Sequence, residues 1–151
     1  MQVHSHILVP TDGSELSKVT AQRAVAFASA LKAKITFFHA KPERRQSFFG
    51  GEGGAFVDQV SPEYFESISE KLANDYLNTL TEMATAAGVE FDTAIGSTGE
   101  PYEGIIDAAK THQCDLIIMA SHGRRGIKGL ILGSQTQKVL TYSSIPVLVY
   151  R

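Results

Sequence analysis

The stretch that decides the fold is "DLIIMASHGRRGIKGLILGSQTQKVL", residues 115–140. Every residue from 116 to 120 is apolar, which is typical of a short strand covered on both faces, as in a parallel sheet. A basic loop containing several glycines follows, and a helical pattern then begins at Ser134 and continues to about Tyr142. The stretch therefore predicts a strand, a long loop and a helix in that order.

The same alternation of strand and helix extends through the rest of the chain. The expected strands are "HILVP" (6–10), "KITFFHA" (34–40), "VEFDTAIG" (89–96), "DLIIMA" (115–120) and "IPVLVY" (145–150). The helical patterns between them cover 14–33, 61–87, 101–113 and 134–142. Because strands that alternate with helices form right-handed crossovers, we expect an α/β fold: a doubly wound five-stranded parallel sheet with helices on both faces.

The longest predicted helix has clear start and stop signals. Ser61 provides a capping hydroxyl, Pro62 suits the first turn, and Gly88 is a typical stop. Its apolar residues recur three or four positions apart, which predicts one buried face. The members of this face are Phe65, Ile68, Leu72, Tyr76, Leu80, Met83 and Ala87.

Composition and charge restrict the function. A chain of 151 residues fits one domain over residues 1–151, and its net charge of −2 gives no overall attraction for nucleic acid or an acidic membrane surface. The single cysteine, Cys114, suits a reducing compartment. Since no apolar run approaches the roughly 20 residues of a membrane span, we expect a cytoplasmic protein with no membrane or nucleic-acid partner.

Two loops are candidates for a ligand site, because ligands of such sheets bind beyond the carboxyl ends of the strands. These loops are "PTDGSE" after the first strand and "SHGRRGIKGLILGS" after the fourth. Gly123 would let backbone N–H groups approach a phosphate, and Gly133-Ser134 begins a helix whose amino end attracts anions. The spacing alone also fits a simple turn, with Ser134 serving only as a helix cap and Arg124 solvated. Both readings stay open from spacing alone.

The loop after the first strand also has two readings. Asp12 and Glu15 are three residues apart ahead of a helix, which is the pattern of a capping box, and the spacing alone favours this structural role. Alternatively, the carboxylate of Asp12 accepts hydrogen bonds from a ribose or holds a metal ion through water.

The chain resembles the universal stress protein family over its entire length. The resemblance is carried by "ILVPTDGSE", "DLIIMASHGRRG", "LILGSQTQKVL" and "IPVLVY". The nucleotide-binding branch of that family has Gly-x-x-Gly, nine residues, then Gly-Ser/Thr. In this chain Gly123, nine residues, Gly133 and Ser134 match, and Ala120 stands in place of the first glycine.

The resemblance implies an adenine-nucleotide site for ATP, ADP or AMP. Phosphates are expected against Gly123, Gly133 and Ser134, and the ribose against Asp12 and the backbone of Ala120. The remaining expected contacts are Pro10, Thr11, His39 and Ala40 for adenine, with His122, Arg124 and Gln135 as flanking residues. If the position of Ala120 needs a positive φ, its side chain is costly, whereas at an ordinary φ the methyl group is harmless.

The resemblance further implies the strand order 3-2-1-4-5, which places the last strand at an edge that pairs with a second copy. We expect a homodimer through residues 146–150, from Pro146 to Tyr150. The expected function is a dimeric regulatory or sensing module with an unknown protein partner. Mg²⁺ would accompany ATP, and hydrolysis would at most be slow, because one carboxylate without a base is a poor catalyst. The alternative is a stress-response interaction protein that binds no nucleotide.

The remaining reactive residues favour structural roles. His122 is expected to hydrogen-bond the loop backbone, and Cys114 to lie in the core. His4 and His6 would share one face of a strand, but no third ligand lies near them in the sequence, so zinc is not expected. Residues 50–54, from Gly50 to Gly54, belong to a glycine-rich loop for which closure over a ligand is an open question.

Overall fold

The computed structural model describes residues 3–44, 60–123 and 132–151. Its elements in chain order are β1 (His6–Pro10), α1 (Glu15–Leu31), β2 (Lys34–Lys41), α3 (Pro62–Ala86), β3 (Phe91–Ser97), α4 (Pro101–Thr111), β4 (Leu116–Ala120), α5 (Ser134–Tyr142) and β5 (Val147–Tyr150). The strands form a five-stranded parallel sheet in the order β3-β2-β1-β4-β5. This confirms the predicted fold class and strand order.

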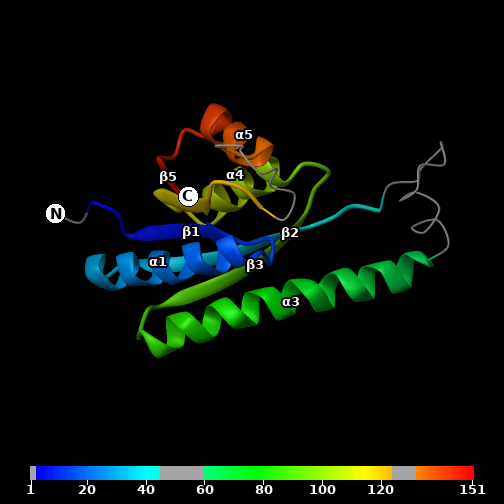
Figure 1. The fold of residues 1–151 in the computed structure, drawn as a ribbon, viewed down its shortest axis with the longest axis horizontal. Coiled ribbons are helices and arrows are strands. Elements are labelled where there is room, and N and C mark those ends of the chain that lie inside the picture. The colour runs from blue at the N-terminus through cyan, green and yellow to red at the C-terminus, as the bar shows by residue number, and fades with distance from the viewer. Residues whose placement is uncertain (1–2, 45–59, 124–131) are drawn as a thin grey trace.

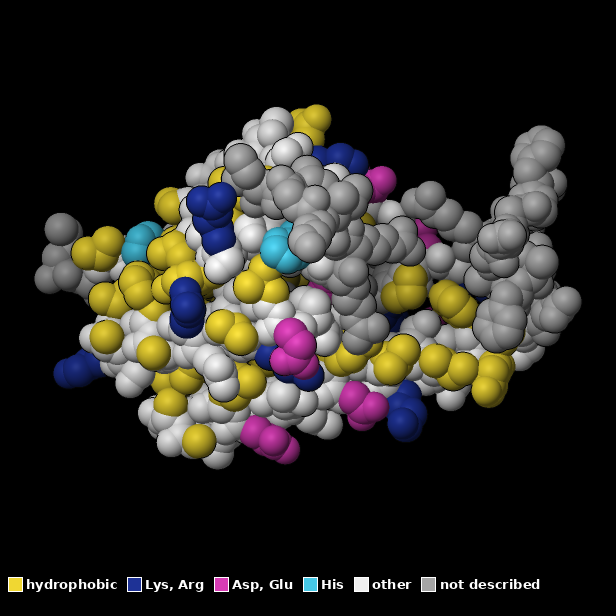
Figure 2. All heavy atoms as spheres, viewed as in Figure 1, with side chains coloured by type: hydrophobic (Ala, Val, Ile, Leu, Met, Phe, Trp, Pro, Cys, Tyr) yellow, Lys and Arg dark blue, Asp and Glu magenta, His cyan; other side chains and the backbone are white. Residues whose placement is uncertain are grey.

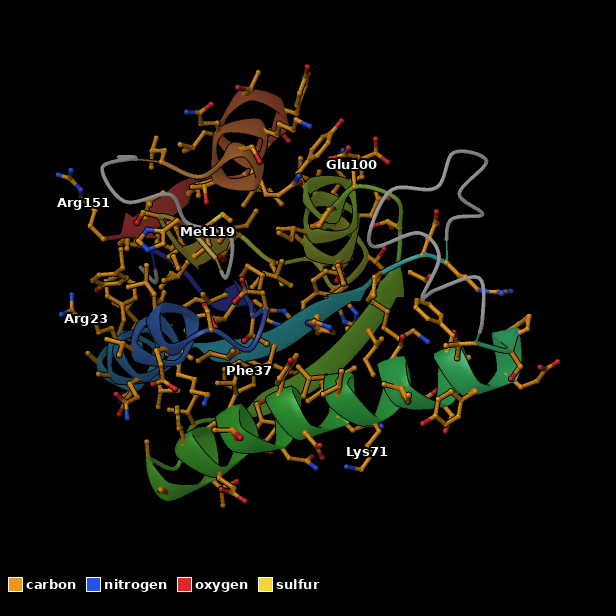
Figure 3. The ribbon with its side chains drawn as sticks, turned by 45° about the vertical axis from the view of Figure 1, so that its right-hand side comes forward. Arg23, Phe37, Lys71, Glu100, Met119 and Arg151 are labelled. Carbon is orange, nitrogen blue, oxygen red and sulfur yellow. The ribbon has the colours of Figure 1, made fainter. Side chains whose placement is uncertain are left out.

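Two helices cover each face of the sheet, with α1 and α3 on one side and α4 and α5 on the other (Figure 1). Side chains alternate along each strand. In β1, Ile7 and Val9 pack toward α1, while Leu8 packs toward α4. Phe37 and Met119 lie on opposite faces in the same way, the first on the side of α3 and the second on the side of α5 (Figure 3).

The predicted apolar face of α3 is confirmed only in part, because the fully buried face is rotated relative to it and Phe65, Tyr76 and Met83 are partly buried. Leu80 is buried as expected, but the other buried positions are Ser69, Ala73, Leu77 and Ala84. The small residues Ala73 and Ala84 face the sheet because they allow the helix to approach it more closely. The spacing of apolar residues in the sequence does not reveal this preference for small side chains.

The rotation leaves large apolar side chains of α3 in solvent. Tyr64, Ile68 and Leu72 are 59%, 41% and 44% exposed. A row of hydrophobic side chains runs along this helix in Figure 2, and its first turns extend beyond the strands in Figure 1. We refer to these three residues as the α3 stripe.

The predicted ends of α3 are confirmed. Ser61 is the N-cap and accepts a hydrogen bond from Tyr64 N, Pro62 is in the first turn, and Gly88 has φ +67° after the last helical residue. In the described ranges, none of the helices combines the length and the apolar character that a bilayer span requires.

Candidate nucleotide site

The loops after β1 and β4 meet at the carboxyl edge of the sheet. Residues of β1 pair directly with β4, with Ile7 opposite Leu116, so the ends of these strands lie side by side. The contact between the loops is so tight that a Cβ on Gly123 would overlap the carboxylate of Asp12. The φ of Gly123 is outside the left-handed region, so glycine is required here for close approach.

Asp12 organises the loop after β1. Its Oδ1 accepts a hydrogen bond from Ser14 N at 2.9 Å, and Gly13 N donates to Thr11 Oγ1 at 3.1 Å. Ser14, with extended backbone, is the N-cap of α1 and accepts from Ser17 N at 3.2 Å. The predicted capping box of Asp12 with Glu15 is therefore wrong. Ser14 takes the capping role because its hydroxyl is one residue from the first turn.

The start of α5 is packed closely against the end of β4. Gly133 N donates to Ser121 O at 2.6 Å, and a Cβ on Gly133 would lie 3.3 Å from both Ser121 O and His122 Cα. Gly133 is the N-cap, and Ser134 is an exposed first-turn residue. The predicted capping role of Ser134 is thus wrong, and its hydroxyl is not used to close the helix. With no side-chain cap, the amides of this first turn are the donors that the helix itself cannot satisfy.

Ala120 is the last residue of β4 and is 8% exposed. Among the described residues, the non-glycine positions with positive φ are Lys32 and Gln113, so Ala120 has ordinary backbone geometry. Its carbonyl accepts a hydrogen bond from Thr136 Oγ1 at 3.0 Å. Alanine in place of the motif glycine therefore carries no backbone strain here.

Two of the flanking residues are held by the protein. His122 Nδ1 lies 3.1 Å from Ser121 Oγ, so its partner is a side-chain hydroxyl and not the loop backbone that was predicted. The Gln135 side chain accepts from Tyr102 N at 2.9 Å and donates to Glu100 at 3.0 Å, which fixes α5 to the start of α4. The side chain of Gln135 is thus engaged in helix packing, which sequence reasoning did not anticipate.

The expected adenine contacts lie at the ends of β1 and β2. Pro10 ends β1, and Ala40 pairs with Gly96 across β2 and β3. Thr11 N donates to Phe38 O at 2.8 Å, and Thr11 O lies 2.7 Å from His39 Nδ1. The structure therefore joins the loop after β1 to the end of β2. Arg124, Arg125, Lys128 and the 50–54 loop lie outside the described residues.

Sequence reasoning missed the contribution of α3 to this edge. Tyr76, Leu72 and Ser69 line a cavity together with Asp12 and His39. The ring of Tyr76 lies against Gly13, which has φ +79°, so closely that a Cβ there would overlap it. No motif marks Tyr76, because its partners are far away in the sequence, and only its place in the apolar pattern of α3 offered a signal.

Other reactive residues lie at the opposite, amino ends of the strands. His6 Nε2 lies 2.8 Å from Thr36 Oγ1, and burial followed by the charge of Lys34 lowers the pKa of His6. Cys114 is in the core as predicted, and burial raises the pKa of its thiol to about 11. Across the described parts of the chain, no group of three or more His, Cys, Asp or Glu side chains is arranged to hold a metal ion.

A family model described as "Universal stress protein family" matches residues 4–151, which confirms the resemblance read from the motifs. The chain is 29% identical to universal stress protein MJ0577 of Methanocaldococcus jannaschii, covering 99% of this chain and 96% of that protein. It is 32% identical to universal stress protein YxiE of Bacillus subtilis, covering 96% and 97%.

Solved structures show the same fold. The structure of MJ0577 matches with a TM-score of 0.76 at 30% identity, covering 96% of this chain and 94% of that one. A universal stress protein in complex with cAMP matches with a TM-score of 0.72 at 22% identity, covering 98% and 97%. A family protein from Arabidopsis thaliana with AMP bound matches with a TM-score of 0.66 at 16% identity, covering 96% and 90%.

Proposed function

Since the chain belongs to the universal stress protein family, we propose that it binds an adenine nucleotide across the crevice between the loops after β1 and β4. The observation that carries the proposal is the contact of Asp12 with Gly123, which brings a carboxylate to the edge of a glycine loop. The whole of residues 1–151 would act as one nucleotide-binding domain, and a cytoplasmic location is part of the proposal.

The phosphates would lie at the amino end of α5. The open amides of its first turn and the positive end of the helix dipole favour an anion there. Gly133 allows this turn to approach closely, and the exposed hydroxyl of Ser134 is free of a capping role. Gly123 would supply the facing donor, and Arg124 would add positive charge.

The sugar and base would lie toward β1 and β2. Carboxylate oxygens accept hydrogen bonds from ribose hydroxyls, so Asp12 suits the sugar, with the backbone of Ala120 beside it. Adenine would lie near Pro10, Thr11 and the residues that end β2. The solved relatives with cAMP and with AMP bound share the fold of this chain and support the binding of an adenine nucleotide.

We further propose a regulatory or sensing role, with any ATP hydrolysis slow. Fast phosphoryl transfer needs a metal clamp and a positioned base. Asp12 alone provides neither a complete set of metal ligands nor a positioned base. Mg²⁺ entering with ATP would be held by Asp12 through water and by the phosphates. AMP would bind without it.

A homodimer through β5 completes the proposal. This strand is at the edge of the sheet, and residues 147–150 are each half-buried, so their free edge suits pairing with a second copy. Small-angle scattering should give the mass of a dimer, and Val149→Lys should shift it to a monomer. A monomeric wild-type protein at high concentration would contradict this part of the proposal.

The second candidate is an interaction protein of the same fold that binds no nucleotide. The α3 stripe favours it, because Tyr64, Ile68 and Leu72 expose apolar surface on one helix. In this case the loop after β4 has only a structural role.

Calorimetric titration of nucleotide-stripped protein with ATP, ADP, AMP and GTP, with and without Mg²⁺, separates the two candidates. We expect adenine-selective binding that is lost in Gly133→Val, whose side chain would press on the backbone of Ser121 and His122. Gly88→Ala is the matched control, since nothing lies within 4 Å of a Cβ there. Folded wild-type protein that gives no heat with any nucleotide would favour the interaction protein.

A further inference from the structure

A carboxylate from outside the two loops lies at the amino end of α5. Glu100 directly precedes α4, and Figure 3 shows it at the start of that helix. Its Oε2 accepts a hydrogen bond from Gln135 Nε2 at 3.0 Å, and Gln135 is the second residue of α5. A negative charge is therefore fixed beside the turn where the phosphates of the nucleotide are proposed to bind.

The Glu100 side chain is directed to α5 and not to its own helix. Glu100 is the N-cap of α4, but within the described residues its side chain makes no capping bond. Gln135 Oε1 instead accepts from Tyr102 N, in the first turn of α4, at 2.9 Å. The two helices thus exchange side chains, and this exchange holds the Glu100 carboxylate in place although it is 41% exposed.

The same carboxylate engages a cation of α5. Lys138 Nζ donates to Glu100 Oε2 at 3.2 Å and lies 5.3 Å from the centre of the Tyr102 ring. Long side chains on a helix lean toward its amino end, so a lysine one turn after Ser134 would otherwise add positive charge to the phosphate region. Glu100 offsets this charge and holds the ammonium group on the side of α4.

A fixed anion near a helix amino end repels a second anion that binds there. The bond from Glu100 to Gln135 and a phosphate hydrogen bond each span about 3 Å, with the Gln135 side chain between them, so the two anions would lie roughly 8–10 Å apart. At this distance in water, and at low salt, each pair of unit charges changes a binding constant by about twofold. The penalty therefore grows with the charge of the ligand.

We propose that Glu100 sets the charge selectivity of the nucleotide site, because it weakens binding in proportion to the negative charge on the phosphates. AMP carries about two such charges and Mg²⁺-free ATP about four, so the carboxylate opposes ATP more strongly. The inference rests on the proposed nucleotide binding. It adds a specificity-determining residue that lies outside the glycine motif and acts through the electrostatic field of the site.

The test compares wild-type protein with Glu100→Gln in calorimetric titrations at low salt, with AMP, Mg²⁺-free ATP and adenosine as ligands. Glutamine has nearly the same shape and keeps a side-chain acceptor, so the substitution chiefly removes the charge. AMP should bind about fourfold more tightly to the variant, and ATP at least about tenfold more tightly. The affinity for adenosine, which has no phosphate, should not rise.

Glu90→Gln is the matched control. Glu90 also pairs with a lysine, since Lys34 Nζ lies 3.6 Å from its Oε1, but it precedes β3 at the opposite, amino edge of the sheet. This variant makes the same change in net charge and should leave the affinities for all three ligands nearly unchanged. Equal affinities of wild type and Glu100→Gln for AMP and ATP, or an equal gain in Glu90→Gln, would overturn the inference.

Salt separates an effect of charge from an effect of structure. At about 1 M salt the Debye length is about 3 Å, so wild type and Glu100→Gln should bind AMP with equal affinity. If Glu100 only held α5 on α4, the variant would bind AMP more weakly at every salt concentration, and this result would overturn the inference while the proposed function stands. Failure of both proteins to bind any of the three ligands would overturn the proposed function as well.

Discussion

The packing of Tyr76 on the Gly13 turn can be tested by adding one methyl group. Gly13 has φ +79°, and a Cβ at this position would overlap the ring of Tyr76. Gly88 has φ +67° with nothing within 4 Å of its Cβ position. Alanine at either site meets the same backbone strain, but only alanine at Gly13 collides with a neighbour. The pair of variants therefore separates strain from packing.

The expected magnitudes follow from this difference. A left-handed residue with a side chain costs about 1–2 kcal/mol, which we expect for Gly88→Ala. Overpacking adds about 1–3 kcal/mol, so Gly13→Ala should lose roughly 2–5 kcal/mol of the free energy of unfolding. Each kcal/mol corresponds to roughly 2–4 °C in the melting temperature of a chain of this size.

Denaturant titration monitored by circular dichroism measures these free energies. The Tyr76→Ala background serves as the control: there, Gly13→Ala should cost about as much as Gly88→Ala, because the ring is gone. If Gly13→Ala and Gly88→Ala were equally destabilising in the wild-type background, Tyr76 would not pack on the turn and the cavity wall described above would be wrong.

Three further predictions concern single residues. Burial and the charge of Lys34 place the pKa of His6 below its ordinary 6.5, so the unfolded chain binds the proton first as the pH falls. The free energy of unfolding should therefore decrease as the pH falls through about 6.5. Denaturation at several pH values should show this slope, and His6→Gln should reduce it. The pKa of Cys114 is raised to about 11, so its thiol should resist alkylation at neutral pH in the folded protein. In denaturant it should react at the rate of an ordinary cysteine. Rapid labelling of the native state would contradict the burial of Cys114. Gly123→Ala should displace the carboxylate of Asp12 and weaken AMP binding about tenfold in calorimetry. The melting temperature should change little, because Gly123 is exposed and has no left-handed φ. An unchanged affinity would show that Asp12 does not contact the ligand.

Much of the fold could be predicted from strong local signals. Each element was indicated by a local signal, either a continuous apolar run for a strand or a capping residue for a helix, such as Ser61-Pro62. Strands and helices that alternate along a short chain are compatible with few sheet topologies. The edge position of β5 and the meeting of the two loops followed from the family order rather than from pattern, because nothing local records which strands are neighbours.

Two of the differences have one physical cause, which is that side chains respond to their neighbours in the folded structure. The face of α3 turned because Ala73 and Ala84 fit the sheet better than Ile68 and Leu72. The side chain of Gln135 bonds the start of α4, a contact between helices that the sequence did not indicate. Neither preference can be read from spacing.

The cavity wall was missed for the same reason. Tyr76 reaches the Gly13 turn from a different crossover, so no motif joins the two residues. By contrast, the sequence showed that alanine at position 120 would be costly only if the backbone there had a positive φ. The φ of Ala120 is ordinary, so the residue is not strained.

The neighbouring positions of β1 and β4 have a consequence for synthesis of the chain. Asp12 leaves the ribosome before Gly123 and α5, and the described elements from α1 to β4 lie between them in the chain. Contacts between such distant segments form late in folding. A nascent chain that ends before β4 has only one of the two loops of the proposed site, so nucleotide binding as proposed would distinguish finished molecules from incomplete ones.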